Sequence, residues 1–296
     1  YSSLFLMEEY MKTFFYLLSF IFIVYGQVNG DVNVLNKDRS SLLIQSMQSS
    51  HSLFRHRKLT VRTSLPAIQI KRLMMVHQFG ADIHQFRYKT YFPTSEQFEQ
   101  VHNFNYSLFT SFKLRNAWSI NQSLSAFYIA SSANTFHFKD IKINGNIFAE
   151  SPINKQFIFS FGVGYQTLFG KTSIVPTLHL KGHLQKKLSF ALGLPNSYIK
   201  YDLNWQHTIA IIAAINDFET VSKPNKLVYG SVDIGLKYMF WLNTHWALTT
   251  QLSYPVFQTH KISTDHNKVL QDLTLPTCTT LGLGIQFNPF RFFGRS

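Results

Sequence analysis

The chain has 296 residues, of which 45% are hydrophobic and 16% aromatic, yet its mean hydropathy is only -0.04. Apolar and polar residues are therefore interleaved, and after residue 30 no run of about 18 apolar residues could form a transmembrane helix. The formal net charge is +13, but the lysines and arginines are scattered, and neither a basic helix nor a zinc-finger spacing is present, so nucleic-acid binding is not expected. The single cysteine, Cys278, excludes an internal disulfide.

The N-terminal stretch has the pattern of an export signal. Lys12 precedes an apolar run of signal-peptide length, and small residues at Gly26 and Gly30 offer cleavage sites. A membrane anchor is the alternative, which the shortness of the apolar run disfavours. We therefore expect residues 1–30 to be a signal peptide and the mature chain to be exported.

The next segment, residues 31–66, has no clean periodicity. It contains a serine-rich stretch at 46–52 and a basic cluster at 55–58. Three interpretations remain open for this N-terminal segment: a periplasmic tail, a short helix in a lumen, or an extra strand over residues 59–65.

From residue 67 onward the pattern is that of β-strands, and residues 156–169 alternate most strictly. One face of this strand carries Phe157, Phe159, Phe161, Val163, Tyr165, Thr167 and Phe169, and the other carries Ser160, Gly162, Gly164 and Gln166. The strand is about twice the usual length, and its second face is small and uncharged, as in a strand between lipid and a crowded polar interior. The same alternation returns over residues 281–288.

About twelve such strands are expected in residues 67–293, which predicts an all-β fold, a closed antiparallel transmembrane barrel, with ten or fourteen strands as alternatives. The strands are expected at 67–88, 102–115, 118–132, 140–149, 156–169, 172–183, 187–194, 197–203, 206–217, 227–241, 244–257 and 276–290.

Long connections at 89–101, 133–139, 218–226 and 258–275 alternate with short ones, as outer loops alternate with periplasmic turns. All four tryptophans, at 118, 205, 241 and 246, flank expected inner turns and predict an aromatic girdle.

At this point the chain resembles the uncharacterised outer-membrane β-barrel proteins of Gram-negative bacteria. The resemblance rests on the export signal, on the segments FIFSFGVGY and TLGLGIQF, and on the aromatic ending from Asn288 to Phe293. It implies a barrel in the outer membrane whose last strand is read by the barrel-insertion machinery. Gly294, Arg295 and Ser296 follow the aromatic ending, which departs from the strict form of that signal.

No spacing in the sequence indicates an enzyme, a cofactor or a metal site. No histidine is followed two residues later by serine, as a lipase-like barrel would need, and nucleotide-binding and zinc-protease motifs are absent. Asp82 and His84 share a face, but no paired acids accompany them. His179 and His183 lie four residues apart, roughly 13 Å along a strand and too far to share one ion.

The charged residues on the faces predicted to point inward carry the functional hypothesis. The expected lumen-lining residues are Asp82, Lys113, Arg115, His179, Lys181, His183, Lys200, Asp202, Asp233 and Lys237. Lysine and arginine outnumber aspartate among them, which favours passage of anions through a narrow lumen.

The leading hypothesis is therefore a non-enzymatic outer-membrane barrel that acts as a narrow channel or transporter for small anionic solutes. The alternative is a plugged barrel that presents outer loops or joins a membrane complex, and a lipid-modifying enzyme is a remote third interpretation. The expected partners are outer-membrane lipid and lipopolysaccharide, and the barrel-insertion machinery during assembly.

Overall fold

The computed structural model describes residues 42–50, 54–89, 96–115, 117–131, 140–168, 171–184, 187–193, 196–264, 269–272 and 278–288. The expected signal peptide, including Gly26 and Gly30, and the aromatic ending beyond Asn288 lie outside the described residues. Within the described ranges, no helix is long and apolar enough to cross a membrane.

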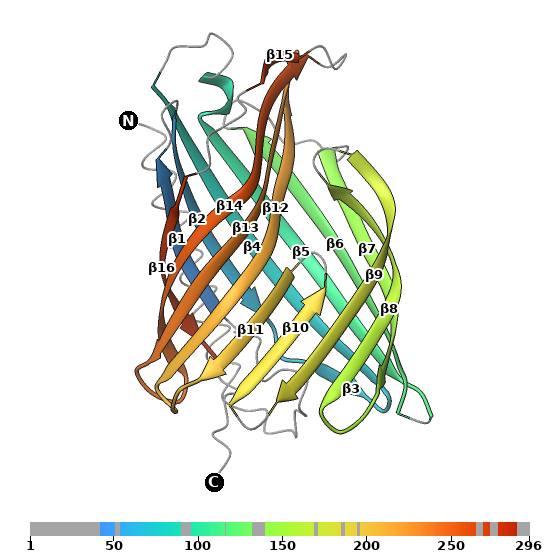
Figure 1. The fold of residues 1–296 in the computed structure, drawn as a ribbon. Helices are drawn as coiled ribbons and strands as arrows, with labels where there is room; N and C mark the ends of the chain where they lie inside the picture. The colour runs from blue at the N-terminus through green and yellow to red at the C-terminus, as the bar shows by residue number, and fades with distance from the viewer. Residues whose placement is uncertain are drawn as a thin grey trace. The chain divides into compact units, whose positions relative to one another are not determined.

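Fourteen antiparallel strands form a closed ring in the described part of the chain (Figure 1). The elements are β1 (Leu42–Ser50), β2 (Phe54–Ser64), β3 (Ile68–Ile70), β4 (Leu73–Tyr88), η2 (Glu96–Phe98), β5 (Gln100–Lys113), β6 (Ser119–Ser131), β7 (Ile141–Pro152), β8 (Phe157–Leu168), β9 (Lys171–Leu184), β10 (Leu188–Gly193), β11 (Asn196–Asp202), β12 (His207–Ser222), β13 (Asn225–Trp241), β14 (Trp246–Thr264), β15 (Val269–Asp272) and β16 (Thr280–Phe287). Each strand of the ring pairs with the next one, and β1 closes the ring by pairing with both β2 and β16. The short strands β3 and β15 pair only with β4 and β14 and stand outside the ring.

The strand count corrects the expectation of about twelve, since fourteen was only an alternative. Each expected strand overlaps one of β4 to β14 or β16, and the two additional strands are β1 and β2. The barrel therefore begins at Leu42 rather than at residue 67, and the extra-strand interpretation of residues 31–66 comes closest. Strand β2, which the extra-strand interpretation covers over residues 59–64, was not predicted in full because its first residues carry Arg55 and Arg57 on one face and Lys58 on the other, so apolar and polar residues do not alternate there.

At one end of the barrel, a repeated asparagine closes three of the tight turns. The side-chain Oδ1 atoms of Asn154, Asn204 and Asn243 each accept hydrogen bonds from the backbone N–H groups two and three residues later, at 2.8–2.9 Å. Asparagine favours such turns because its side chain replaces a backbone acceptor. Short turns mark the periplasmic end of a bacterial barrel, so we call this the inner end and the opposite one the outer end.

Two of the expected long outer connections, 218–226 and 258–275, are largely strand. Strand β12 runs to Ser222, β13 begins at Asn225, and β14 extends to Thr264. These outer strand ends carry polar residues on both faces, which made them resemble loops in the sequence. Polar residues on both faces suit strand ends that extend past the lipid into water.

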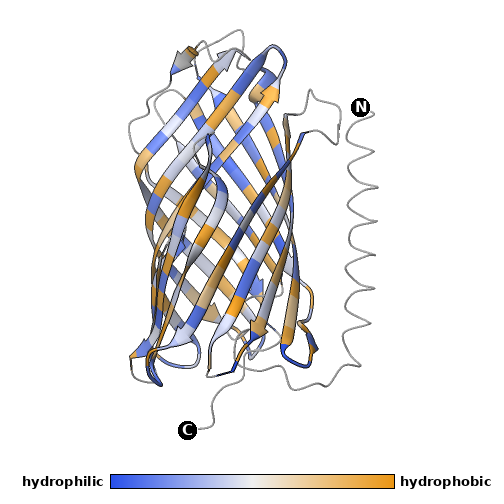
Figure 2. Cartoon of the chain, turned by 90° about the vertical axis from the view of Figure 1, so that its right-hand side faces the viewer, coloured by the Kyte–Doolittle hydropathy of each residue, from blue (hydrophilic) through white to orange (hydrophobic). Residues whose placement is uncertain are grey.

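The predicted two-faced pattern of the strands is confirmed. On β8 the outward side chains of Phe159, Phe161, Val163 and Tyr165 are 38–54% exposed, whereas Ser160 is fully buried. Figure 2 shows hydrophobic and hydrophilic residues alternating along the strands. An apolar outer belt around a polar interior is the arrangement of a barrel that spans the outer membrane.

The tryptophans follow the predicted girdle only in part. Trp118 and Trp205 are exposed beside inner turns, at 39% and 52%. Trp241 is 4% exposed, because its position on β13 shares the inward face with the buried Met239.

Gly162 allows β7 and β8 to approach closely. A Cβ atom at this position would meet the backbone oxygen of Ile147 and, at 2.5 Å, the Cα atom of Phe148, whereas a Cβ at Gly145 would meet nothing closer than 3.5 Å. We expect Gly162→Ala to destabilise the barrel by about 1–3 kcal/mol, because the backbone must shift to relieve the overlap. Gly145→Ala is the matched control and should leave the urea midpoint of unfolding in lipid vesicles unchanged. Equal midpoints for the two variants would contradict the expected overlap.

Candidate functional site

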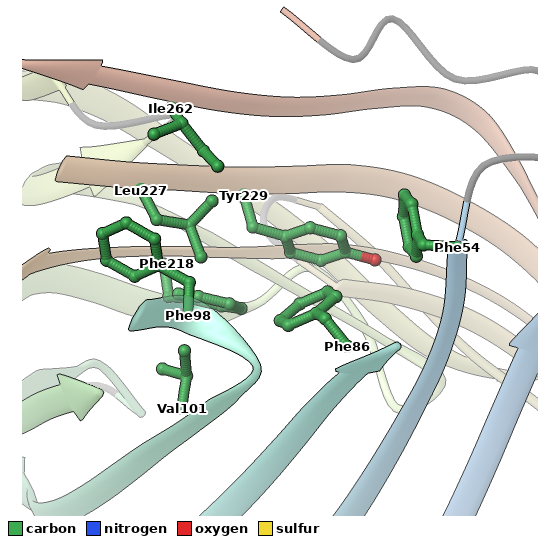
Figure 3. Close-up of a cluster of buried hydrophobic side chains, with 8 residues drawn as sticks. All are labelled: Phe54, Phe86, Phe98, Val101, Phe218, Leu227, Tyr229 and Ile262. Atoms are coloured by element: carbon green, nitrogen blue, oxygen red, sulfur yellow. The ribbon is translucent and has the colours of Figure 1, made fainter. Parts of the chain in front are cut away.

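A cluster of buried hydrophobic side chains occupies the lumen near the outer end. The cluster consists of Phe54, Phe86, Phe98, Val101, Phe218, Leu227, Tyr229 and Ile262 (Figure 3). Its members come from both sides of the ring, and the ring of Phe86 on β4 lies 6.4 Å from that of Phe218 on β12 and 5.7 Å from that of Tyr229 on β13. Since β4 is far from β12 and β13 around the ring, these contacts cross the lumen. We call these eight residues the aromatic cluster.

Two histidines pack against the aromatic cluster and pair with each other. The rings of His56 and His84 are nearly parallel, and Nε2 of His56 lies 3.0 Å from Nδ1 of His84. His84 also lies 4.5 Å from the ring of Phe218. Because one nitrogen of such a pair must accept the hydrogen bond, at least one imidazole is neutral. The pairing satisfies a polar group of each ring in apolar surroundings.

The outer end of β12 leans across the lumen and narrows it further. Strand β11 pairs with β12 only as far as Ala214, so the later residues of β12 are released from that neighbour. Beyond that point, Thr220 Oγ1 donates a hydrogen bond to the backbone oxygen of Ile129 on β6. Glu219 forms an ion pair with Lys142 on β7, with 3.2 Å between the charged atoms. The outer ends of β6, β7 and β12 are thereby held together.

A polar cavity of about 360 Å³ lies beside the aromatic cluster, on its inner side. Seven carboxamide side chains and three serines line it: Gln78, Asn103, Asn105, Asn144, Asn146, Gln166, Asn216, Ser107, Ser123 and Ser125. Phe218 and Tyr229 belong to the cluster and also border the cavity, as does His84, which packs against Phe218. The volume lies in the range of small-molecule sites, roughly 300–1,000 Å³.

The charged groups that line the cavity largely neutralise one another. Asp82 is buried, and its carboxylate lies 3.7 Å from Lys58 Nζ and 3.8 Å from Arg62 Nη2. Thr60 Oγ1 donates to the same carboxylate at 2.7 Å. Asp217 supplies a second acidic group, so the cavity holds two basic and two acidic side chains.

Of the ten residues expected to line the lumen, only Asp82 borders this cavity. Asp233 lies close to it and accepts hydrogen bonds from Asn216 Nδ2 at 2.7 Å and Ser231 Oγ at 3.2 Å. Lys181 lies further toward the inner end and pairs with Glu150 at 2.9 Å.

The other predicted residues are spread over the inner half of the barrel. Asp202 accepts a hydrogen bond from Thr208 at 2.6 Å. His179, Lys200 and Lys237 are half-buried, whereas His183, Lys113 and Arg115 are exposed near the inner end. The structure does not gather the ten residues into one site.

The cavity residues were missed for two reasons. A strand over residues 59–65, which include Arg62, was only one of three open interpretations, and Lys58 lies just before it, so neither cation was assigned to the lumen. The amides and serines were available in the sequence as polar residues at every second position, for example Asn103 and Asn105, or Ser123 and Ser125, but only charges were used to define the lumen.

The contacts of Asp82 and His84 do not support a catalytic role for this pair. His84 is bonded to His56, and Asp82 faces two cationic side chains. Among the residues that the structure describes, no three His, Cys, Asp or Glu side chains are placed to hold a metal ion.

The family model described as "Domain of unknown function (DUF6268)" matches residues 74–226, slightly more than half of the chain. No curated protein matches the sequence significantly. Among solved structures, the chain is similar to an outer-membrane channel from Pseudomonas putida F1, with 8% identity, a TM-score of 0.43, and coverage of 87% of this chain and 100% of the other. It is similar to the KdgM porin in complex with disordered oligogalacturonate, with 8% identity, a TM-score of 0.39, and coverage of 83% and 98%. It is also similar to outer membrane phospholipase A from Escherichia coli, with 11% identity, a TM-score of 0.38, and coverage of 87% and 100%.

Proposed function

The chain belongs to the family described as "Domain of unknown function (DUF6268)", and we propose that its barrel is a narrow outer-membrane channel for small polar solutes, closed at its outer end by the aromatic cluster. The proposal rests chiefly on the amide-lined cavity in the lumen. A barrel that served only as a scaffold would be stable with an interior whose polar groups all satisfy one another. Here a sizeable polar space remains next to the closure.

The lining of the cavity suits solutes that both donate and accept hydrogen bonds. Carboxamides and hydroxyls have both capacities, whereas carboxylates only accept and ammonium groups only donate. Some of these groups pair with each other, such as Ser107 with Ser125 at 2.8 Å and Ser123 with Asn146 at 3.0 Å. The buried Oδ1 atom of Asn103 has no hydrogen-bond partner among the described residues, which leaves one polar group of the lining unsatisfied.

A preference for anions remains part of the proposal, but it belongs to the inner half of the lumen. By the alternation of their strands, Lys113 and Lys237 are in inward positions there, whereas Lys181 is neutralised by Glu150. In a narrow lumen, fixed positive charges raise the local concentration of anions.

Changing Lys113 and Lys237 together to glutamate should move the reversal potential from anion toward cation preference. The measurement is best made with Phe86 and Phe218 replaced by alanine, so that the closure does not limit the current. The effect should shrink at ~1 M salt, where the screening length falls to about 3 Å. Glutamate at Lys71 and Lys155, which lie in inner turns, is the matched control and should change the potential little. Cation preference in the parent protein, or no response to the Lys113 and Lys237 change, would contradict the anion preference.

The aromatic cluster also favours a second candidate function, a permanently closed barrel that presents its outer strand ends to a partner. The extended ends of β12, β13 and β14 would then form the binding surface. Single-channel recording in lipid bilayers separates the two candidates, because a permanently closed barrel should stay silent even when the cluster is truncated. Either role is non-enzymatic, and insertion by the barrel-assembly machinery is proposed for both.

A further inference from the structure

Three arginines form a basic patch on the outside of the barrel at its outer end. Arg55 and Arg57 lie on β2, Arg87 lies on β4, and all three side chains are exposed. Their neighbours in the sequence, Phe54 and His56, are buried inside the barrel. Since successive side chains of a strand point to opposite faces, the arginines point outward.

The basic patch begins immediately above the apolar belt. Along the outward face of β2 the residues run Arg55, Arg57 and then Leu59, which is 40% exposed. On the outward face of β4, Phe79 is 44% exposed. Neighbours on one face of a strand are about 6.6 Å apart, so Arg57 lies one step beyond the apolar side chains. This is the depth at which lipid headgroups meet the barrel.

The two outermost arginines lie directly opposite each other. Arg55 is the cross-strand partner of Arg87, and like charges in that position are destabilising. None of the ion pairs among the described residues includes Arg55, Arg57 or Arg87. Arg57 lies two residues from Arg55 on the same face of β2, and its Nε donates a hydrogen bond to Gln48 Oε1 on β1 at 3.1 Å. Three positive charges therefore lie on neighbouring positions of one face, and a bound anion would offset their repulsion.

We propose that Arg55, Arg57 and Arg87 bind a phosphate group of a phosphorylated lipid in the outer leaflet. Guanidinium groups bind phosphate through paired, charge-assisted hydrogen bonds, and arginines at neighbouring positions of one sheet face can share one phosphate. The apolar belt directly below the patch provides the surface on which acyl chains would lie, which favours a lipid over free phosphate. The site is on the outside of the barrel and does not depend on the channel function.

The test compares lipid binding by the full chain and by the variant Arg55→Gln/Arg87→Gln in detergent micelles. The probe is lipid A that carries two phosphates, and lipid A without phosphates and inorganic phosphate are compared with it. We expect the double variant to bind the phosphorylated lipid about ten- to hundredfold more weakly, because two charge-assisted contacts are lost. Changing Lys71 and Arg72, which are exposed at the inner end, to glutamine removes the same charge and should leave binding unchanged.

Several results would overturn the proposal. These are equal binding of lipid A with and without phosphates, equal losses in the two double variants, or displacement of the lipid by inorganic phosphate at equal concentration.

A second measurement shows whether the variant is folded: Arg87→Gln alone should raise or maintain the unfolding temperature in lipid-free micelles, because it removes the like-charge pair. With phosphorylated lipid A present, the same variant should be stabilised less than the parent protein. A parent protein that gains no stability from phosphorylated lipid A would also contradict the site.

Discussion

Replacing Phe86 and Phe218 by alanine is expected to convert a barrel that seldom conducts into one with long-lived open steps. The two rings approach within 6.4 Å across the lumen, and both belong to the aromatic cluster. Truncation of a buried phenylalanine costs roughly 3–5 kcal/mol of packing where the site cannot collapse. If only about 1.4 kcal/mol of that cost falls on the closed state, the ratio of open to closed channels rises about tenfold. Single-channel recording in planar bilayers measures this ratio directly.

The matched control replaces two phenylalanines that face lipid. Phe79 on β4 and Phe104 on β5 are 44% and 52% exposed on the outward face. Their replacement by alanine removes the same number of rings without touching the lumen, and conductance should not change. A cluster variant that folds but stays silent would argue against a channel and favour the permanently closed barrel.

The sequence predicted the lipid-facing half of this fold well because its physical signal is strong. A strand such as β8 must carry large apolar residues on every second position to face lipid, and Phe161 and Ser160 could be assigned to opposite faces from that alternation alone. Strands β1 and β2 lack the signal. The outer end of β2 lies beyond the apolar belt, and there the residues outside the barrel, Arg55 and Arg57, are charged, whereas Phe54 points inside.

The aromatic cluster was not predicted for the same reason: at the outer end of the barrel, large apolar side chains point into the lumen. Large apolar residues were assigned to lipid throughout, but Phe86 lies two and four residues after His84 and Asp82, on the inward face of β4. Following one face along the whole strand from Asp82 would have placed Phe86 in the lumen. The closure itself could not have been predicted, because it depends on contacts between β4 and strands that lie more than a hundred residues later in the chain.

The amides that line the cavity were not predicted because only charged residues and histidines were chosen as lumen candidates. Asn103 and Asn105 follow the same alternation as the lipid-facing residues beside them, so their inward position was available from the sequence. The sequence does not show which of these amides line the same cavity, because the bend of β12 toward β6 sets the shape of the lumen there.

An arginine at Phe161 should largely prevent assembly of the barrel, whereas an arginine at Gln166 on the same strand should be tolerated. Phe161 is 45% exposed on the outward face of β8, and arginine at membrane depth costs about 2–4 kcal/mol. Gln166 lines the polar cavity, where a longer side chain can extend into the space of about 360 Å³. Ser160, although inward, is unsuitable for this comparison because it is fully buried and donates a hydrogen bond to Glu150 at 3.0 Å.

The measurement is the fraction of protein that reaches the folded, heat-modifiable form on electrophoresis after refolding into lipid vesicles. Gln166→Arg should reach nearly the parent fraction, and it should also reduce conductance in the background with Phe86 and Phe218 changed to alanine, because it places a bulky side chain in the lumen. Phe161→Leu keeps an apolar side chain toward lipid and should assemble as the parent does. If the arginines at 161 and 166 impaired assembly equally, the assignment of the two faces of β8 would be wrong, and with it the location of the cavity inside the barrel.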